Sequence, residues 1–266
     1  AGAATALDPF GVGRSAEGQD AFHRGNVEAR LGHAEKAIEA YREAIRRSSG
    51  LAAARYHLGV VLLGEGREEE GIRELIAAME LDPKNPRIPL ALGDHMERKG
   101  EAGQAETLYR RSLSVDPYFA DAYAALGGLL AERRRAAEAE PFFRRALEIE
   151  PESPAALVGL GKLLGEAGRT GEAAAFLERG VRAAPDWRDA WFEWGGHLFR
   201  AGRPAEAAGA FEKAARLEPR DVPSRMNLAL ARRASGDVGG AIAALREVLS
   251  IEPENETARR RLEDLE

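Results

Sequence analysis

Proline recurs at one fixed interval along most of this chain. Six of its prolines lie 34 residues apart, at Pro83, Pro117, Pro151, Pro185, Pro219 and Pro253. A fixed period of this size indicates one supersecondary unit copied along the chain, because each copy buries its apolar face against its neighbours. We therefore expect function to lie on an extended surface and not around one central core.

The prolines define seven repeats when each is placed at position 32 of its unit. The repeats cover 238 of the 266 residues and span 18–51, 52–85, 86–119, 120–153, 154–187, 188–221 and 222–255. No shift in composition and no Ser/Pro-rich linker separates them, so we treat them as one continuous array. We expect residues 1–17 to be an N-terminal tail or linker and residues 256–266 to be a C-terminal capping helix.

Four positions of the repeat carry residues of restricted size. Position 8 is always small: Gly25, Gly59, Gly93, Gly127, Gly161, Gly195 and Ala229. Position 20 is always alanine or glycine, and position 15 is glycine except in the fourth repeat, where it is Arg134. Position 24 is large: Tyr41, Leu75, Tyr109, Phe143, Leu177, Phe211 and Leu245.

Two closely packed helices in each repeat explain these positions. Apolar residues at helical spacing, as in Leu58, Leu62 and Leu63, predict an amphipathic helix over about the first 14 positions, and a second helix follows. Glycine at position 15 permits the left-handed conformation in which the first helix ends and the chain reverses. The two helices then run antiparallel, and small residues at positions 8 and 20 allow them to touch. Capping side chains predict where the next helices begin, at Asn85, Ser153, Asp221 and Asn255.

The period and the restricted positions together resemble the tetratricopeptide repeat family, and the resemblance covers nearly the whole chain. It implies an all-α fold, a right-handed superhelical solenoid of antiparallel helix pairs. It also implies that the first helix of each repeat lines a concave groove, with positions 2, 5, 9 and 12 pointing inward. Such a groove is expected to bind a peptide or helix of a partner protein.

Applied to this sequence, the resemblance predicts which residues form the groove. They are Tyr56, Leu90, Asp94, Glu97, Asp121, Ala124, Gly128, Val158, Lys162, Phe192, Glu193, Phe199 and Arg200. The fourth and fifth repeats present mostly small residues there, which predicts a recess flanked by aromatic anchors such as Phe192 and Phe199. When positions 6 and 13 of repeats three to six are included, the predicted groove has seven acidic residues and four basic ones. This bias favours a neutral or basic partner segment.

Other kinds of site find little support in the sequence. The formal net charge of −6 argues against a general nucleic-acid binder. Arg133, Arg134 and Arg135 are better explained as a solvated turn near a helix C-terminus than as an anion site. No apolar run reaches the length of a membrane span. The five histidines show no metal-ligand spacing, and no general acid and base can be paired, so we expect no metal, no cofactor and no enzymatic activity.

The sequence leaves the compartment and two alternative functions open. The absence of cysteine excludes a disulfide framework and thiolate zinc sites, but it suits both the cytosol and the periplasm. The leading hypothesis is a non-enzymatic interaction scaffold. The alternatives are a self-assembling structural repeat protein, in which one solenoid docks into the groove of another, and the substrate-recruiting region of a larger enzyme.

Overall fold

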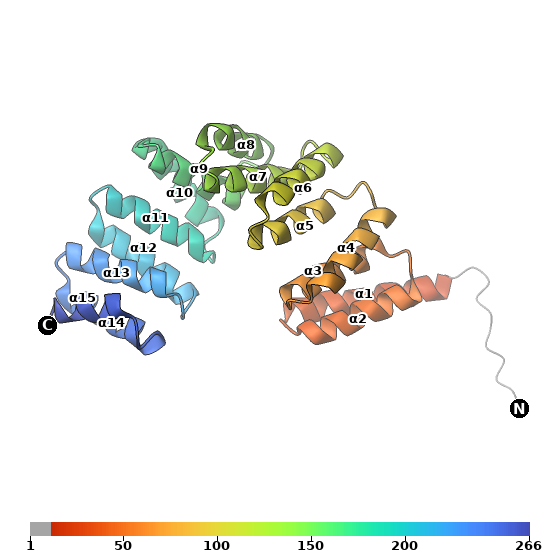
Figure 1. Ribbon diagram of the computed structural model, residues 1–266, viewed down its shortest axis with the longest axis horizontal. Coiled ribbons are helices and arrows are strands. Elements are labelled where there is room, and N and C mark those ends of the chain that lie inside the picture. Colours follow the sequence, from red (N-terminus) through yellow and green to blue (C-terminus); the bar gives the residue numbers. More distant parts are fainter. Residues whose placement is uncertain (1–11) are drawn as a thin grey trace, which may run out of the picture. The chain divides into compact units, whose positions relative to one another are not determined.

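The computed structural model describes residues 12–266, so residues 1–11, most of the expected tail, lie outside the described part. The described residues form 15 α-helices and no strand, which confirms the all-α fold class (Figure 1). The helices are α1 (Val12–Arg30), α2 (Ala34–Arg47), α3 (Ala52–Gly64), α4 (Glu68–Leu81), α5 (Arg87–Arg98), α6 (Ala102–Val115), α7 (Ala120–Glu132), α8 (Ala136–Ile149), α9 (Pro154–Glu166), α10 (Thr170–Ala183), α11 (Arg188–Arg200), α12 (Pro204–Leu217), α13 (Val222–Ala234), α14 (Val238–Ile251) and α15 (Glu256–Glu263).

The helices pack in tandem pairs, one pair to a repeat. The chain divides into two compact units, and the division between Ala122 and Tyr123 falls inside α7. In unit 1, α1 packs on α2, α3 on α4 and α5 on α6; in unit 2, α9 packs on α10, α11 on α12 and α13 on α14. Second helices also pack on the first helix of the next repeat, as α2 does on α3 and α12 on α13. The pairing is the one that the 34-residue period predicts.

The small residue at position 8 lies against the large residue at position 24 of the same repeat. A Cβ atom added to Gly195 on α11 would stand 2.8 Å from the ring of Phe211 on α12, closer than packed carbon atoms approach. The same approach occurs between Gly127 and Phe143, which holds α7 against α8. Glycine at position 8 therefore sets the spacing within a helix pair, as the sequence predicts.

The turn inside each repeat uses a left-handed residue at position 15. Gly66, two residues after the end of α3, has φ of +74°, and the other turn glycines have similar values. Arg134 adopts φ of +58° at the same place, although a Cβ atom disfavours this conformation. The turn is therefore imposed by the packing of the helices around it, whichever residue occupies it.

Helix starts agree largely with the expected caps. Asp221, Asn255 and Asn85 each accept a hydrogen bond from a nearby backbone N–H group. Ser153 precedes α9 but its side chain makes no capping bond. Asp237, which is not among the caps predicted from the sequence, caps α14 with a bond of 2.8 Å from the N–H of Gly240.

The first helix begins at Val12. Residues 12–17, which the sequence predicts to be part of a tail, therefore belong to α1.

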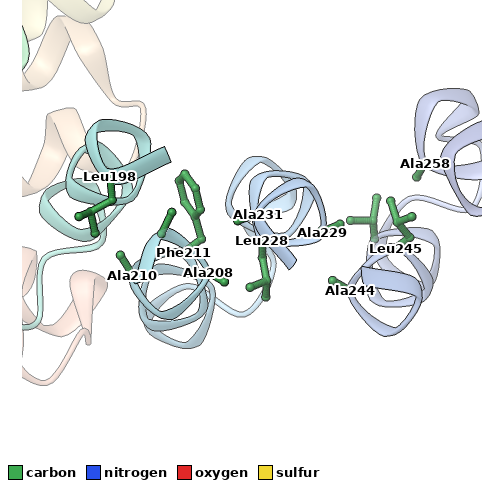
Figure 2. Packing of buried hydrophobic residues seen from close by; sticks show 12 residues of the cluster. Leu198, Ala208, Ala210, Phe211, Leu228, Ala229, Ala231, Ala244, Leu245 and Ala258 are labelled. Carbon is green, nitrogen blue, oxygen red and sulfur yellow. The ribbon is translucent and has the colours of Figure 1, made fainter. Parts of the chain in front are cut away.

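Helix α15 covers the apolar end of the last repeat. Leu245 of α14 lies beside Ala258 of α15, and both are fully buried (Figure 2). Val248 of α14 is buried in the same cluster. Leu262 and Leu265 pack partly against the same cluster. Helix α15 thus occupies residues 256–263 of the segment that the sequence predicts to be a capping helix. No helix in the described part of the chain is long and apolar enough to cross a membrane.

Candidate interaction surface on the first helices

The first helices of successive repeats lie side by side within each unit. In unit 1, α3 packs beside α1 and α5; in unit 2, α11 packs beside α9 and α13. Side chains that project from these helices away from their second-helix partners therefore form a continuous wall in each unit. Most of the predicted groove residues lie on these two walls.

A hollow of about 220 Å³ opens between α11 and α13 of unit 2. Its lining contains four predicted groove residues, Phe192, Glu193, Phe199 and Arg200. The remaining lining residues are Gly196, Phe211, Asn227 and Leu230. The structure therefore brings together, around one concavity, aromatic rings, one carboxylate, one guanidinium and one amide.

The aromatic rings of this hollow differ in their exposure. The ring of Phe192 meets that of Phe211 nearly edge-to-face, with centroids 5.7 Å apart, and the Arg188 guanidinium carbon lies 5.6 Å from the Phe192 centroid. Phe211, which projects between α11 and α13, is only 3% exposed (Figure 2). Phe199 is 39% exposed although it is a large apolar residue. Phe192 and Phe211 thus form a fixed base, and Phe199 offers a free aromatic edge.

A second hollow of about 590 Å³ lies between α7 and α9, with the start of α8 at its edge. It contains two predicted groove residues, Gly128 and Lys162, in the part of the chain where small residues predict a recess. The other lining residues are Ala131, Glu132, Arg134, Ala136, Phe143, Gly159, Leu163 and Glu166.

An ion pair connects the linings of the two hollows. Lys162 Nζ on α9 lies 3.1 Å from Glu193 Oε1 on α11. Burial alone would lower the pKa of Lys162, but the charge of Glu193, with smaller effects from Glu166 and Glu132, raises it above its ordinary value. Lys162 is therefore cationic at neutral pH and is largely satisfied by Glu193. It follows that the two hollows belong to one surface of unit 2.

The unit 1 wall carries a half-buried polar cluster. The hydroxyl of Tyr109 on α6 lies 2.9 Å from Asp94 Oδ1 and 2.6 Å from Glu97 Oε2, both on α5. Burial raises the pKa of Asp94, partly offset by the hydrogen bond from Tyr109. Burial and the two carboxylates raise the pKa of Tyr109, so its hydroxyl stays protonated. Tyr56 of α3 is half-buried nearby, and its pKa is raised mainly by burial, with Asp94 and Asp121 adding to the effect of burial and Arg87 opposing it.

Four predicted groove residues line neither hollow and make no hydrogen bond in the Tyr109 cluster. Val158 is 5% exposed and packs against α10 and α11, where its methyl group faces Gly180. Ala124 on α7 is likewise buried. Leu90 lies half-buried on α5, and Asp121 is exposed at the start of α7. The packing therefore makes Val158 and Ala124 part of the interior, whereas Leu90 and Asp121 remain at the surface.

Three residues that line the hollows, Phe143, Phe211 and Asn227, are not among the groove residues predicted from the sequence. A signal for the two phenylalanines exists in the printed sequence. Where position 24 is tyrosine, position 9 is polar, and where position 24 is phenylalanine, position 9 is glycine. Comparing these two positions between repeats would have marked the fourth and sixth repeats as the open ones.

The chemistry of these hollows suits recognition of another molecule. Apolar bases with a few charged or amide groups at the rim are typical of surfaces that bind polypeptide side chains. Among residues 12–266, no group of three or more His, Cys, Asp or Glu side chains is arranged to hold a metal ion.

Comparison with solved structures gives similar folds at low sequence identity. YrrB, described as a TPR protein with an unusual peptide-binding site, matches 71% of this chain and 97% of its own, with 21% identity and a TM-score of 0.53. The Cut9–Hcn1 assembly of the APC/C matches 97% of this chain and 49% of its own matched chain, with 16% identity and a TM-score of 0.76. PilF of Pseudomonas aeruginosa matches 80% of this chain and 97% of its own, with 20% identity and a TM-score of 0.67. No curated protein matches the sequence.

Sequence profiles of the tetratricopeptide repeat match most of the chain. One profile matches residues 22–86, 90–154 and 192–256, and a second matches residues 130–192. The profiles, the tandem helix pairs and the similar solved folds agree on one assignment. The chain belongs to the tetratricopeptide repeat family.

Proposed function

We propose that this protein is a non-enzymatic scaffold that binds a segment of a partner protein on the first-helix wall of unit 2. Its membership of the tetratricopeptide repeat family supports a role in protein–protein interaction. The similar fold of YrrB, described as having a peptide-binding site, supports a peptide as the ligand. We propose a neutral or basic peptide or helix, because unpaired carboxylates accompany the apolar groups of the wall.

One observation carries this proposal: an exposed aromatic ring borders a preformed hollow with an apolar base. Phe199 is 39% exposed at the edge of the α11–α13 hollow, whose base is fixed by Phe192 and Phe211. Aromatic anchors in concave sites provide most of the binding free energy at typical interfaces. A side chain placed in this hollow would bury the Phe199 ring without any rearrangement of the core.

The test is an affinity capture that depends on Phe199. Wild-type protein and Phe199→Ala protein are immobilised and exposed to extract from the native source, and captured proteins are identified by mass spectrometry. We expect Phe199→Ala to weaken capture of the true partner by about tenfold, because truncating an interface anchor costs roughly 1–2 kcal/mol. Circular dichroism should show an unchanged fold, since the ring is not part of the buried core.

Val238→Ala provides the matched control. Val238 is also an exposed apolar residue, 42% accessible, but it lies at the start of the second helix α14 and outside both hollows. Capture should be unchanged in this variant. If the captured partners bind wild-type and Phe199→Ala protein equally, the interaction site does not lie on the unit 2 wall.

A further inference from the structure

The two hollows of unit 2 are built from equivalent positions of repeats four and six. Each has glycine at position 9, phenylalanine at position 24, and residues from positions 6 and 9 of the following repeat. The equivalent pairs are Gly128 with Gly196, Ala131 with Phe199, Glu132 with Arg200, Phe143 with Phe211, Gly159 with Asn227, and Lys162 with Leu230. The same local architecture thus occurs twice, with different groups at its rim.

In two other repeats, a polar side chain occupies the space that is open in these hollows. The Tyr41 hydroxyl donates to Asn26 Oδ1 at 2.9 Å, and Tyr109 makes the equivalent bond to Asp94. Asn26 and Asp94 stand at position 9, where repeats four and six have glycine. A Cβ atom added to Gly128 would meet nothing within 4 Å, so the space next to Gly128 is open in the hollow that Phe143 also lines.

The α11–α13 hollow has the same open space. A Cβ atom added to Gly196 would meet only the Arg200 guanidinium, 3.5 Å away. Replacement of a Tyr–Asn pair by a Phe–Gly pair therefore removes one hydrogen bond and leaves a side-chain-sized space over an aromatic ring. An apolar side chain is the group that suits a space with such a base.

The rims of the two hollows carry opposite charges. Glu132 and Glu166, at the α7–α9 hollow, form no ion pair within residues 12–266, and Lys162 is engaged by Glu193. Arg134, on the turn, is the remaining charged group of that rim. Two free carboxylates against one guanidinium leave this hollow acidic.

The rim of the α11–α13 hollow is basic. Arg200 stands at position 13, where the other hollow has Glu132, and it has no carboxylate partner in the described part of the chain. Glu193, the only carboxylate of this lining, is paired with Lys162. The side chain of Asn227 makes no hydrogen bond within the described residues, so its amide is free to bond to a bound backbone.

We propose that the two hollows bind two apolar side chains of one partner segment, which places a basic side chain at the α7–α9 hollow and an acidic side chain at the α11–α13 hollow. The proposal rests on the proposed function and adds the chemistry of the bound segment and the hollow at which each of its charged side chains lies. The Lys162–Glu193 ion pair lies between the hollows, which makes them neighbouring subsites of one ligand.

Two double variants close one hollow each by copying a pair that the chain already contains. Gly196→Asn with Phe211→Tyr reproduces the Asn26–Tyr41 pair over the α11–α13 hollow, and Gly128→Asn with Phe143→Tyr does so over the other. The backbone has room for both asparagines. Circular dichroism and urea unfolding of each variant check that the added tyrosine hydroxyl leaves the fold intact. Gly209→Asn on α12 is the matched control, because its Cβ atom would also meet nothing within 4 Å and it lies outside both hollows.

The probe is a library of random 16-residue peptides displayed on phage and selected against the full wild-type chain. Enriched peptides are synthesised with a fluorescein label, and their affinities are measured by fluorescence anisotropy. We expect enriched sequences to share two apolar residues, one near Lys or Arg and the other near Asp or Glu. Each double variant should weaken binding at least about tenfold, and Gly209→Asn should change it by less than about twofold.

A charge reversal tests whether the rim of the α11–α13 hollow selects the charge of the bound segment. Selection against Arg200→Glu protein should replace the acidic residue of the enriched peptides by a basic one. Peptides that bind through a single apolar residue, or equally well to both double variants, would overturn this inference and leave the proposed function standing. Failure to enrich any peptide, together with partner capture that is independent of Phe199, would overturn both.

Discussion

At the scale of single residues, Arg134 departs most clearly from the pattern of the chain. Six repeats use glycine for the left-handed turn residue, and the fourth uses arginine at φ of +58°. A Cβ atom in this conformation costs roughly 1 kcal/mol. The triple-arginine sequence therefore forms a turn, as the sequence analysis predicts, but at a cost in stability that the sequence reveals only when the repeats are compared.

Arg134→Gly should stabilise the protein by about 1 kcal/mol, because glycine adopts the left-handed conformation without steric cost. Urea unfolding, followed by circular dichroism, measures the change. Arg133→Gly is the control, since position 133 does not have positive φ and glycine there only adds conformational freedom to the unfolded chain. If both variants are destabilised, the turn is not strained in the way described.

Asp94 is a half-buried carboxyl group whose protonation is linked to folding. Burial raises its pKa in the folded state above the value in the unfolded chain. The folded state therefore binds this proton more tightly, and the Asp94 contribution to stability is lost as the pH rises through the raised pKa. Above that pH the ionised carboxylate remains buried at a cost.

Asp94→Asn should therefore be more stable than wild type at pH 7, by about 1 kcal/mol, because a neutral amide can still accept the Tyr109 bond, as Asn26 does from Tyr41. The advantage should shrink as the pH falls toward 4 and wild-type Asp94 becomes protonated. Urea unfolding at a series of pH values measures both effects. Glu80→Gln, an exposed carboxyl on α4, controls for the loss of one negative charge; an advantage for Asp94→Asn that does not vary with pH would contradict this account.

At the scale of helices, glycine has two separate roles that the structure distinguishes. Gly195 on α11 faces the Phe211 ring with no room for a methyl group, whereas Gly209 on α12 has nothing within 4 Å of its Cβ position. Both glycines lie inside helices of the same repeat. Only the first is required by packing.

Alanine should consequently have opposite effects at these two positions. Gly195→Ala should destabilise the protein by about 1–3 kcal/mol through overpacking against Phe211. Gly209→Ala should stabilise it by about 0.5–1 kcal/mol, because alanine favours the helix and meets no neighbour. Thermal and urea unfolding of the two variants test the pair, and a stabilising Gly195→Ala would show that α11 and α12 can separate without cost.

The same elements show what the sequence could and could not predict. The helix pairs, their turns and the contact between positions 8 and 24 are predictable. Each position occurs in seven repeats, so a restriction on the size of its residue is visible in the sequence. The interior location of Val158 is not, since it depends on how α9 is rotated against α10 and α11. The hollows are partly predictable: small residues indicated a recess at Gly128, but the role of Phe143 and Phe211 required comparing two positions at once.

At the scale of the whole molecule, each repeat contacts mainly its neighbours in the sequence. First helices touch the adjacent first helices, and second helices touch the next repeat, within each unit. Stability in such an array is approximately a sum of terms for repeats and for the interfaces between them. Damage to one repeat should therefore remain local.

Hydrogen–deuterium exchange provides a direct test of that locality. In Gly195→Ala protein, amide protection should fall in α11 and α12 and in the adjacent helices α10 and α13. Protection in α3 and α4 of unit 1 should stay at the wild-type level. A uniform loss of protection along the chain would instead identify the molecule as one cooperative folding unit.

The exchange between a Tyr–Asn pair and a Phe–Gly pair has a consequence for how such a protein diversifies. Both pairs occupy the same two positions of the repeat. Two substitutions can thus close or open the hollow of one repeat. Ligand preference can therefore change one repeat at a time, during evolution or engineering, while the helical framework stays the same.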